Sequence, residues 1–143
     1  MNGARVRSVG GRIDRSLATL GLAVGDVVVI VAVFSYGLLA HNVDPTASVR
    51  YTTLTILPFL VGWGLVAPLA GAYSTRARTS LSDTAVIVAA AWIGATLVGA
   101  VIRASPAFHG GADVVFVGVT IGVGLLALLP WRIVAAYVAT RAR

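Results

Sequence analysis

Cysteine, lysine and glutamate are all missing from this sequence, and charged residues of any kind are few. Without cysteine, the chain can form neither disulfides nor thiolate metal sites. Charged residues make up 11% of the 143 residues, against about 25% in a typical soluble domain. Because 58% of the residues are hydrophobic, the composition is typical of a membrane protein.

The basic residues are eleven arginines, which lie in short stretches between apolar runs. No soluble module is left that could present them to DNA or RNA, so the sequence argues against nucleic-acid binding. No stretch resembles a phosphate-binding glycine loop or a hydrolytic triad. The sequence therefore predicts a protein that is not an enzyme and holds no cofactor.

Four long apolar runs account for most of the chain, and each reaches or nearly reaches the roughly 20 residues that a membrane-spanning helix needs. We expect helices over about residues 17–40, 51–73, 82–103 and 113–139. The predicted fold is an all-α, integral membrane four-helix bundle over residues 17–140, preceded by a basic tail at residues 1–16. The first run is longer than the apolar part of a signal peptide and lacks a small-residue cleavage site, so we expect it to be retained.

Arginine placement predicts the orientation of these spans. Eight arginines form three clusters, before the first run, between the second and third, and at the end of the chain: Arg5, Arg7, Arg12 and Arg15; Arg76 and Arg78; Arg141 and Arg143. All three clusters fall on one side, which the positive-inside rule makes cytoplasmic. We therefore expect a multi-pass protein of the cell membrane with both termini cytoplasmic and with these arginines near anionic lipid headgroups.

One carboxylate, Asp26, lies well inside the first apolar run. An ionisable side chain there is costly to bury, so it marks a candidate functional site whose partner lies elsewhere in the chain. Counting about 1.5 Å of helix rise per residue from the outer end of each expected helix places Asp26 roughly 21 Å deep, Trp63 roughly 18 Å and Arg132 roughly 28 Å. We expect Asp26 to face the interior of the bundle and to pair with Arg132 or the Trp63 indole.

Two alternatives to this structural pair stay open at the level of the sequence. Asp26 could belong to a proton or ion relay, and Arg132 could extend outward to lipid headgroups instead of inward. A purely structural pair predicts that Asp26→Asn folds nearly normally, whereas Arg132→Ala destabilises the protein.

The second apolar run contains two prolines, Pro58 and Pro68, on either side of Gly62 and Gly64. Each proline frees the carbonyl four residues earlier, and broken helices of this kind line binding sites in transporters. Prolines are also common in membrane helices. We therefore expect a kink without a ligand, although a freed carbonyl could also accept a hydrogen bond from a protonated Asp26.

Small residues four positions apart occur in every apolar run, and this spacing predicts close helix packing in a membrane. The sets are Gly21 and Gly25; Ala67 and Gly71; Ala91, Ala95 and Gly99; Gly118 and Gly122.

Both histidines fall on the predicted outer side, each near an aspartate: His41 with Asp44, and His109 with Asp113. Such a set could ligate a divalent metal if the two loops met. Its spacing matches no recognised metal site, and Asp44 before Pro45 fits a turn while Asp113 fits a helix N-cap. We expect no metal here.

An ordered set of motifs links the runs: "GD" in the first, "PFLVGW" and "GAY" in the second, "RASPAF" after the third and "PWR" in the fourth. From about Leu20 to Tyr137 the chain resembles the domain of unknown function 3054 family, small four-helix membrane proteins found mainly in halophilic archaea and some bacteria. The resemblance implies an integral membrane protein and no particular activity. It directs attention to Asp26, Pro58, Trp63, Arg132 and the outer-end Arg103.

These observations together favour a structural or accessory membrane protein that acts as a homo-oligomer or with a membrane partner protein. The alternative is a small ion- or proton-coupled transporter that works as a homo-oligomer. A water-accessible Asp26 would favour transport, whereas a dry and fully paired Asp26 would favour a structural role.

Overall fold

The computed structural model describes residues 13–108 and 110–142, and this part of the chain forms five helices. They are α1 (Leu17–Ala40), α2 (Val49–Ala70), α3 (Thr75–Thr79), α4 (Leu81–Arg103) and α5 (Val114–Arg141). The all-α prediction is confirmed for these residues, where the only β pairing is an isolated bridge between Ile13 and Tyr73. The four long helices begin and end within three residues of the expected limits, and the short helix α3 is an addition.

Polar side chains cap the starts of α1, α4 and α5. Ser16 accepts a hydrogen bond from the Thr19 N–H at 3.3 Å at the start of α1, and Asp113 accepts one from the Phe116 N–H at 2.8 Å at the start of α5. Such side-chain caps satisfy backbone donors that a helix leaves free. At the other end of α2, Gly71 adopts a left-handed conformation with φ of 83°, which glycine allows without steric cost.

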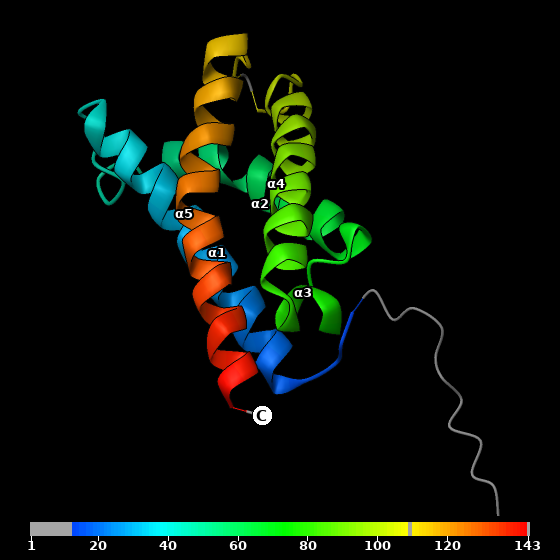
Figure 1. Ribbon diagram of the computed structural model, residues 1–143. Coiled ribbons are helices and arrows are strands. Elements are labelled where there is room, and N and C mark those ends of the chain that lie inside the picture. The colour runs from blue at the N-terminus through cyan, green and yellow to red at the C-terminus, as the bar shows by residue number, and fades with distance from the viewer. Residues whose placement is uncertain (1–12, 109, 143) are drawn as a thin grey trace, which may run out of the picture.

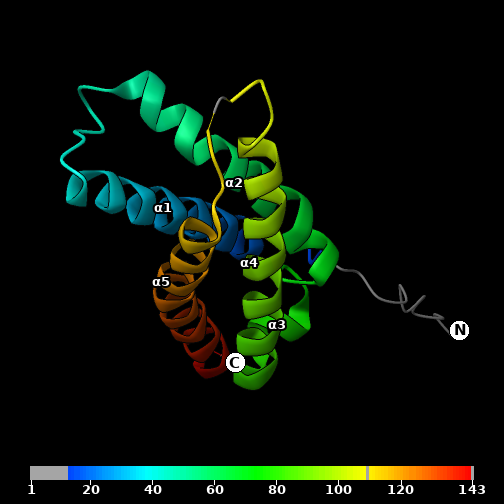
Figure 2. The ribbon, with the colours of Figure 1, turned by 90° about the horizontal axis from the view of Figure 1, so that it is seen from above.

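The helices pack together, and the molecule has two unlike ends (Figures 1 and 2). At the α3 end, α3 lies with the start of α1 and the end of α5. At the opposite end, named here the two-loop end, the α1–α2 loop (41–48) and the α4–α5 loop (104–113) lie well apart in both views. Helix α2 packs most extensively against α4, and α4 packs next most extensively against α5.

Small residues allow the close contact between α2 and α4. A methyl group at Gly62 would run into the backbone carbonyl of Ala95, and one at Gly99 would lie 2.6 Å from the Phe59 ring. At Gly21, Gly118 and Gly122, in contrast, an added Cβ would meet nothing within 4 Å. The four-residue spacing therefore predicts packing in α4 but not along the whole of α1 or α5.

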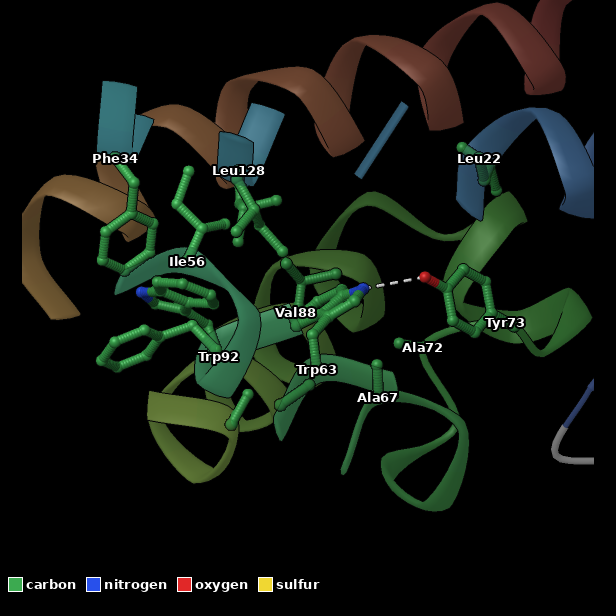
Figure 3. Packing of buried hydrophobic residues seen from close by; sticks show 14 residues of the cluster. Leu22, Phe34, Ile56, Trp63, Ala67, Ala72, Tyr73, Val88, Trp92 and Leu128 are labelled. Carbon is green, nitrogen blue, oxygen red and sulfur yellow. Dashed lines mark hydrogen bonds between the residues drawn. The ribbon is translucent and has the colours of Figure 1, made fainter. Parts of the chain in front are cut away.

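All four long helices are long and apolar enough to cross a membrane. Their buried side chains form one core in which aromatic rings meet: Phe34 stacks on Phe59 with ring centroids 4.7 Å apart. The Trp63 and Trp92 rings lie 6.1 Å apart, a distance at which aromatic pairs attract each other. Figure 3 shows this core between the long helices, with Tyr73 at its edge.

Candidate functional site

The buried ion pair between Asp26 of α1 and Arg132 of α5 is the centre of the candidate site. The Arg132 Nε donates to Asp26 Oδ1 at 2.8 Å, and Arg132 Nη2 donates to Asp26 Oδ2 at 2.7 Å. The Asp26 side chain is 0% exposed and that of Arg132 is 1% exposed. This two-point geometry is the strongest form of an arginine–carboxylate contact.

Two further donors complete the hydrogen bonding of the Asp26 carboxylate. Trp131 Nε1 donates to Oδ1 at 3.0 Å, and the Tyr73 hydroxyl donates to Oδ2 at 2.6 Å. Each carboxylate oxygen therefore accepts two hydrogen bonds, which uses all of the roughly four lone-pair sites that an ionised carboxylate offers. Side chains from α5 and from the segment after α2 therefore supply all four donors.

The partner of Asp26 is held just as firmly. Arg132 Nη1 donates to the backbone carbonyl of Ala72 at 2.8 Å, and the guanidinium carbon lies 5.0 Å from the centre of the Tyr73 ring. The cation therefore gains an attraction to the ring face in addition to its hydrogen bonds. These contacts join α1, α5 and the segment between α2 and α3.

Tyr73 is the link between the ion pair and Trp63. The Trp63 Nε1 donates to the Tyr73 hydroxyl at 2.8 Å, the dashed line in Figure 3. Burial raises the pKa of Tyr73, and the adjacent Asp26 charge raises it further. The hydroxyl therefore stays protonated at neutral pH and donates its proton toward Asp26 while accepting from the indole.

Local backbone features place these side chains. The left-handed Gly71 turns the chain at the end of α2, so that Ala72 and Tyr73 lie beside Arg132. The Asp14 N–H donates to the Tyr73 carbonyl at 2.8 Å and holds this turn from the other side. In α1, Gly25 leaves room for the Trp131 indole, because a Cβ at this position would overlap the ring.

The structure brings together two of the three residues expected at this site and places the third one step away. Asp26 and Arg132 are in direct contact, and Arg132 turns inward rather than toward headgroups. The Trp63 indole reaches Asp26 only through Tyr73. Sequence reasoning missed Tyr73, Trp131 and the Ala72 carbonyl, although "GAY" and "PWR" contain all three.

The two prolines expected to break the second helix do not interrupt it, and they do not contribute to this site. Helix α2 runs without interruption from Val49 to Ala70 through both Pro58 and Pro68. Gly62 faces Ala95 of α4, while a Cβ at Gly64 would meet no atom within 4 Å. The carbonyl that serves the ion pair belongs to Ala72, beyond the helix, and is not one that a proline frees.

Arg103 and the loop residues lie at the two-loop end. Arg103 Nε donates to the Gly111 carbonyl at 3.0 Å, and its guanidinium carbon lies 4.9 Å from the centre of the Phe116 ring. Asp44 accepts from the N–H and hydroxyl of Thr46 at 2.8 and 2.7 Å. The Thr46 hydroxyl, aided by the Thr46 N–H, holds the pKa of Asp44 below its ordinary value.

The four residues considered for a metal site have separate local roles where the structure describes them. Asp44 serves a turn and Asp113 a helix cap, and His41 ends α1. His109 lies outside the described residues. Among residues 13–108 and 110–142, no three His, Cys, Asp or Glu side chains gather as a metal site would require.

A comparison with protein families adds to this geometry. A family described as protein of unknown function (DUF3054) matches residues 23–135, which is most of the chain. The chain belongs to this family. The matched range contains Asp26, Arg132 and every side chain that hydrogen-bonds to Asp26. No curated protein and no solved structure matches the chain.

Proposed function

We propose that this DUF3054 protein is a non-enzymatic, multi-pass protein of the cell membrane that acts as a structural or accessory subunit. Its four long apolar helices and its family membership support the proposal. Side chains of α5 such as Val119, Leu126 and Val134 point outward. These outward faces are available to lipid, to a second copy or to a membrane partner protein.

The observation that carries the proposal is the fully buried and fully hydrogen-bonded carboxylate of Asp26. A residue that relays protons or ions must exchange partners with water or with a second titratable group. Asp26 has no exposed surface and accepts four hydrogen bonds, two of them from an arginine that is itself buried. This arrangement suits a clamp between helices better than the alternative of an ion- or proton-coupled transporter.

The placement of the arginines supports the predicted orientation. The described members of the arginine clusters, Arg15, Arg76, Arg78 and Arg141, all lie at the α3 end. A single basic end is what the positive-inside rule requires of a cytoplasmic face. Arg5, Arg7, Arg12 and Arg143 lie outside the described residues.

Reporter fusions test the topology. We expect a fusion after Arg143 and one in the α3 segment to report a cytoplasmic location, and a fusion in the 41–48 loop to report an external one. An external C-terminus, or an odd number of spans, would contradict the proposal.

Liposomes that contain the purified protein and a trapped pH-sensitive dye test the transport alternative. We expect no proton flux above that of empty liposomes under a pH gradient or a potassium diffusion potential. A flux that Asp26→Asn abolishes, while the exposed-site variant Asp83→Asn retains it, would favour the transporter and overturn the structural proposal.

A further inference from the structure

A cavity of about 300 Å³ lies at the two-loop end, between α1, α2 and α5. The tips of the α1–α2 and α4–α5 hairpins diverge at this end (Figures 1 and 2). Apolar side chains such as Val33, Phe34, Val119 and Val123 line its inner part. Asp26 and Arg132 do not line it, so the cavity is separate from the ion pair.

Arg103 brings a positive charge to this mainly apolar cavity, whose lining also includes His41, Tyr51, Thr55 and Thr120. It is the last residue of α4, so it lies at the loop-side end of the cavity. The ion pairs among the described residues are Arg76–Asp83, Arg78–Asp14 and Arg132–Asp26. None of them involves Arg103, whose only side-chain hydrogen bond within the described part of the chain comes from Nε.

Among the described residues, the two terminal nitrogens of Arg103 have no hydrogen-bond partner, which leaves them to bind an anion. Its guanidinium is held in place by the Gly111 carbonyl and by the Phe116 ring, so little conformational freedom would be lost on binding an anion. A pair of guanidinium N–H groups matches the two oxygens of a carboxylate. Charge complementarity thus calls for an acidic group beside an apolar chain.

We propose that the cavity binds a fatty-acid anion, with its carboxylate on Arg103 and its chain between α1 and α5. The volume is at the lower limit of small-molecule sites, which fits one alkyl chain rather than the two of a phospholipid. The inference rests on the proposed membrane placement, because such a ligand enters the cavity from the bilayer. At the outer boundary of the bilayer, the carboxylate lies at the depth of the headgroups.

The test measures binding of radiolabelled dodecanoate to the full chain in phosphatidylcholine nanodiscs, with empty nanodiscs as the blank. Unlabelled dodecanol and acetate compete as the chain without the charge and the charge without the chain. Arg103→Gln removes the cation, and Arg50→Gln is its control, since Arg50 lies at the same end but does not line this cavity. Gly37→Leu fills the cavity, because Gly37 lines it and a Cβ there meets nothing within 4 Å.

We expect saturable binding of one dodecanoate per chain, weakened at least about tenfold by Arg103→Gln, which corresponds to about 1.4 kcal/mol. Arg50→Gln is expected to bind normally, acetate not to compete, and dodecanol to bind wild type and Arg103→Gln equally. Gly37→Leu is expected to weaken both dodecanoate and dodecanol, which keeps the proposal testable if Arg103→Gln does not fold.

Three results would overturn the proposal: no saturable binding above the blank, equal dodecanoate affinity in wild type and Arg103→Gln, or undiminished binding to Gly37→Leu. Loss of dodecanoate binding when phosphatidylglycerol replaces phosphatidylcholine would assign the cavity to a two-chain lipid instead. The reporter fusions read membrane topology independently, so a failure of this inference is distinguishable from a failure of the proposed function.

Discussion

Arg132 at the α3 end shares its guanidinium among both oxygens of Asp26 and the Ala72 carbonyl and is 1% exposed. Arg103 at the two-loop end makes one hydrogen bond to a backbone carbonyl, is half-buried and lies beside a cavity. Both arginines contact an aromatic ring, that of Tyr73 or of Phe116. The difference is that Arg132 has a carboxylate built into the chain, whereas Arg103 has none among the described residues.

The two ends of the molecule differ in how their helices are held together. At the α3 end, side-chain hydrogen bonds join α1 to α5 and to the segment after α2, where helix packing alone would leave α1 loosely attached. At the two-loop end the hairpins diverge, and the described residues form no comparable network between them. The ion-pair network therefore fixes α1 at the α3 end, whereas the cavity lies at the two-loop end.

The largest expected effect comes from breaking the ion pair. Arg132→Ala leaves the Asp26 carboxylate buried without a cation, and we expect a loss of about 3–5 kcal/mol in the free energy of unfolding. Asp26→Asn likewise leaves the Arg132 guanidinium buried without a counter-charge, because this side chain is only 1% exposed. The earlier expectation that Asp26→Asn folds nearly normally is therefore replaced by one of comparable destabilisation.

Thermal unfolding in detergent measures these losses. The double variant Asp26→Asn with Arg132→Gln removes both charges, and we expect it to be more stable than either single variant. If both single variants unfolded at the wild-type temperature, the ion pair would not be the clamp between the helices.

Tyr73→Phe gives the next largest effect. It takes one donor from Asp26 and leaves the Trp63 indole, which is 2% exposed, without its acceptor. We expect a cost of about 2 kcal/mol, since buried unsatisfied groups and hydrogen bonds to charges each cost about 1–3 kcal/mol. Tyr36→Phe, at a position 72% exposed, is the control and is expected to unfold like wild type.

Two glycines one helical turn apart in α1 give a smaller and sharper contrast. A methyl at Gly25 overlaps the Trp131 indole, whereas one at Gly21 meets no atom within 4 Å. We expect Gly25→Ala to cost at least about 1 kcal/mol by pushing the indole away from Asp26. Gly21→Ala should be neutral or slightly stabilising, since alanine favours helix. Equal unfolding temperatures for the two variants would contradict the close contact of α1 with α5.

The sequence predicts the helices and the central residues of the site, but not all of the contacts within the site. The lengths of the apolar runs locate four helices, and the helix rise per residue predicts a similar depth for Asp26 and Trp63. Both inferences depend only on the local sequence of each helix. The roles of Tyr73 and Trp131 depend on the left-handed turn at Gly71 and on the rotation of α5 against α1. Those are tertiary features, so neighbouring motifs such as "GAY" and "PWR" identify the segments but not the contacts.

The smallest expected effect comes from Asp44, in the α1–α2 loop at the two-loop end. Its pKa lies below the ordinary value near 3.8, because the Thr46 hydroxyl and N–H stabilise the charged form. A carboxyl whose pKa is lowered by folding contributes stability that is present above the unfolded value and is lost as the pH falls through the folded value. We therefore expect Asp44→Asn to unfold at a slightly lower temperature than wild type at pH 7, by less than Tyr73→Phe. The difference should shrink as the pH falls below 3.8 and vanish only below the lowered pKa of folded Asp44, where the wild-type carboxyl is protonated. A difference that persists in acid would show that Asp44 acts through the shape of its turn rather than through its charge.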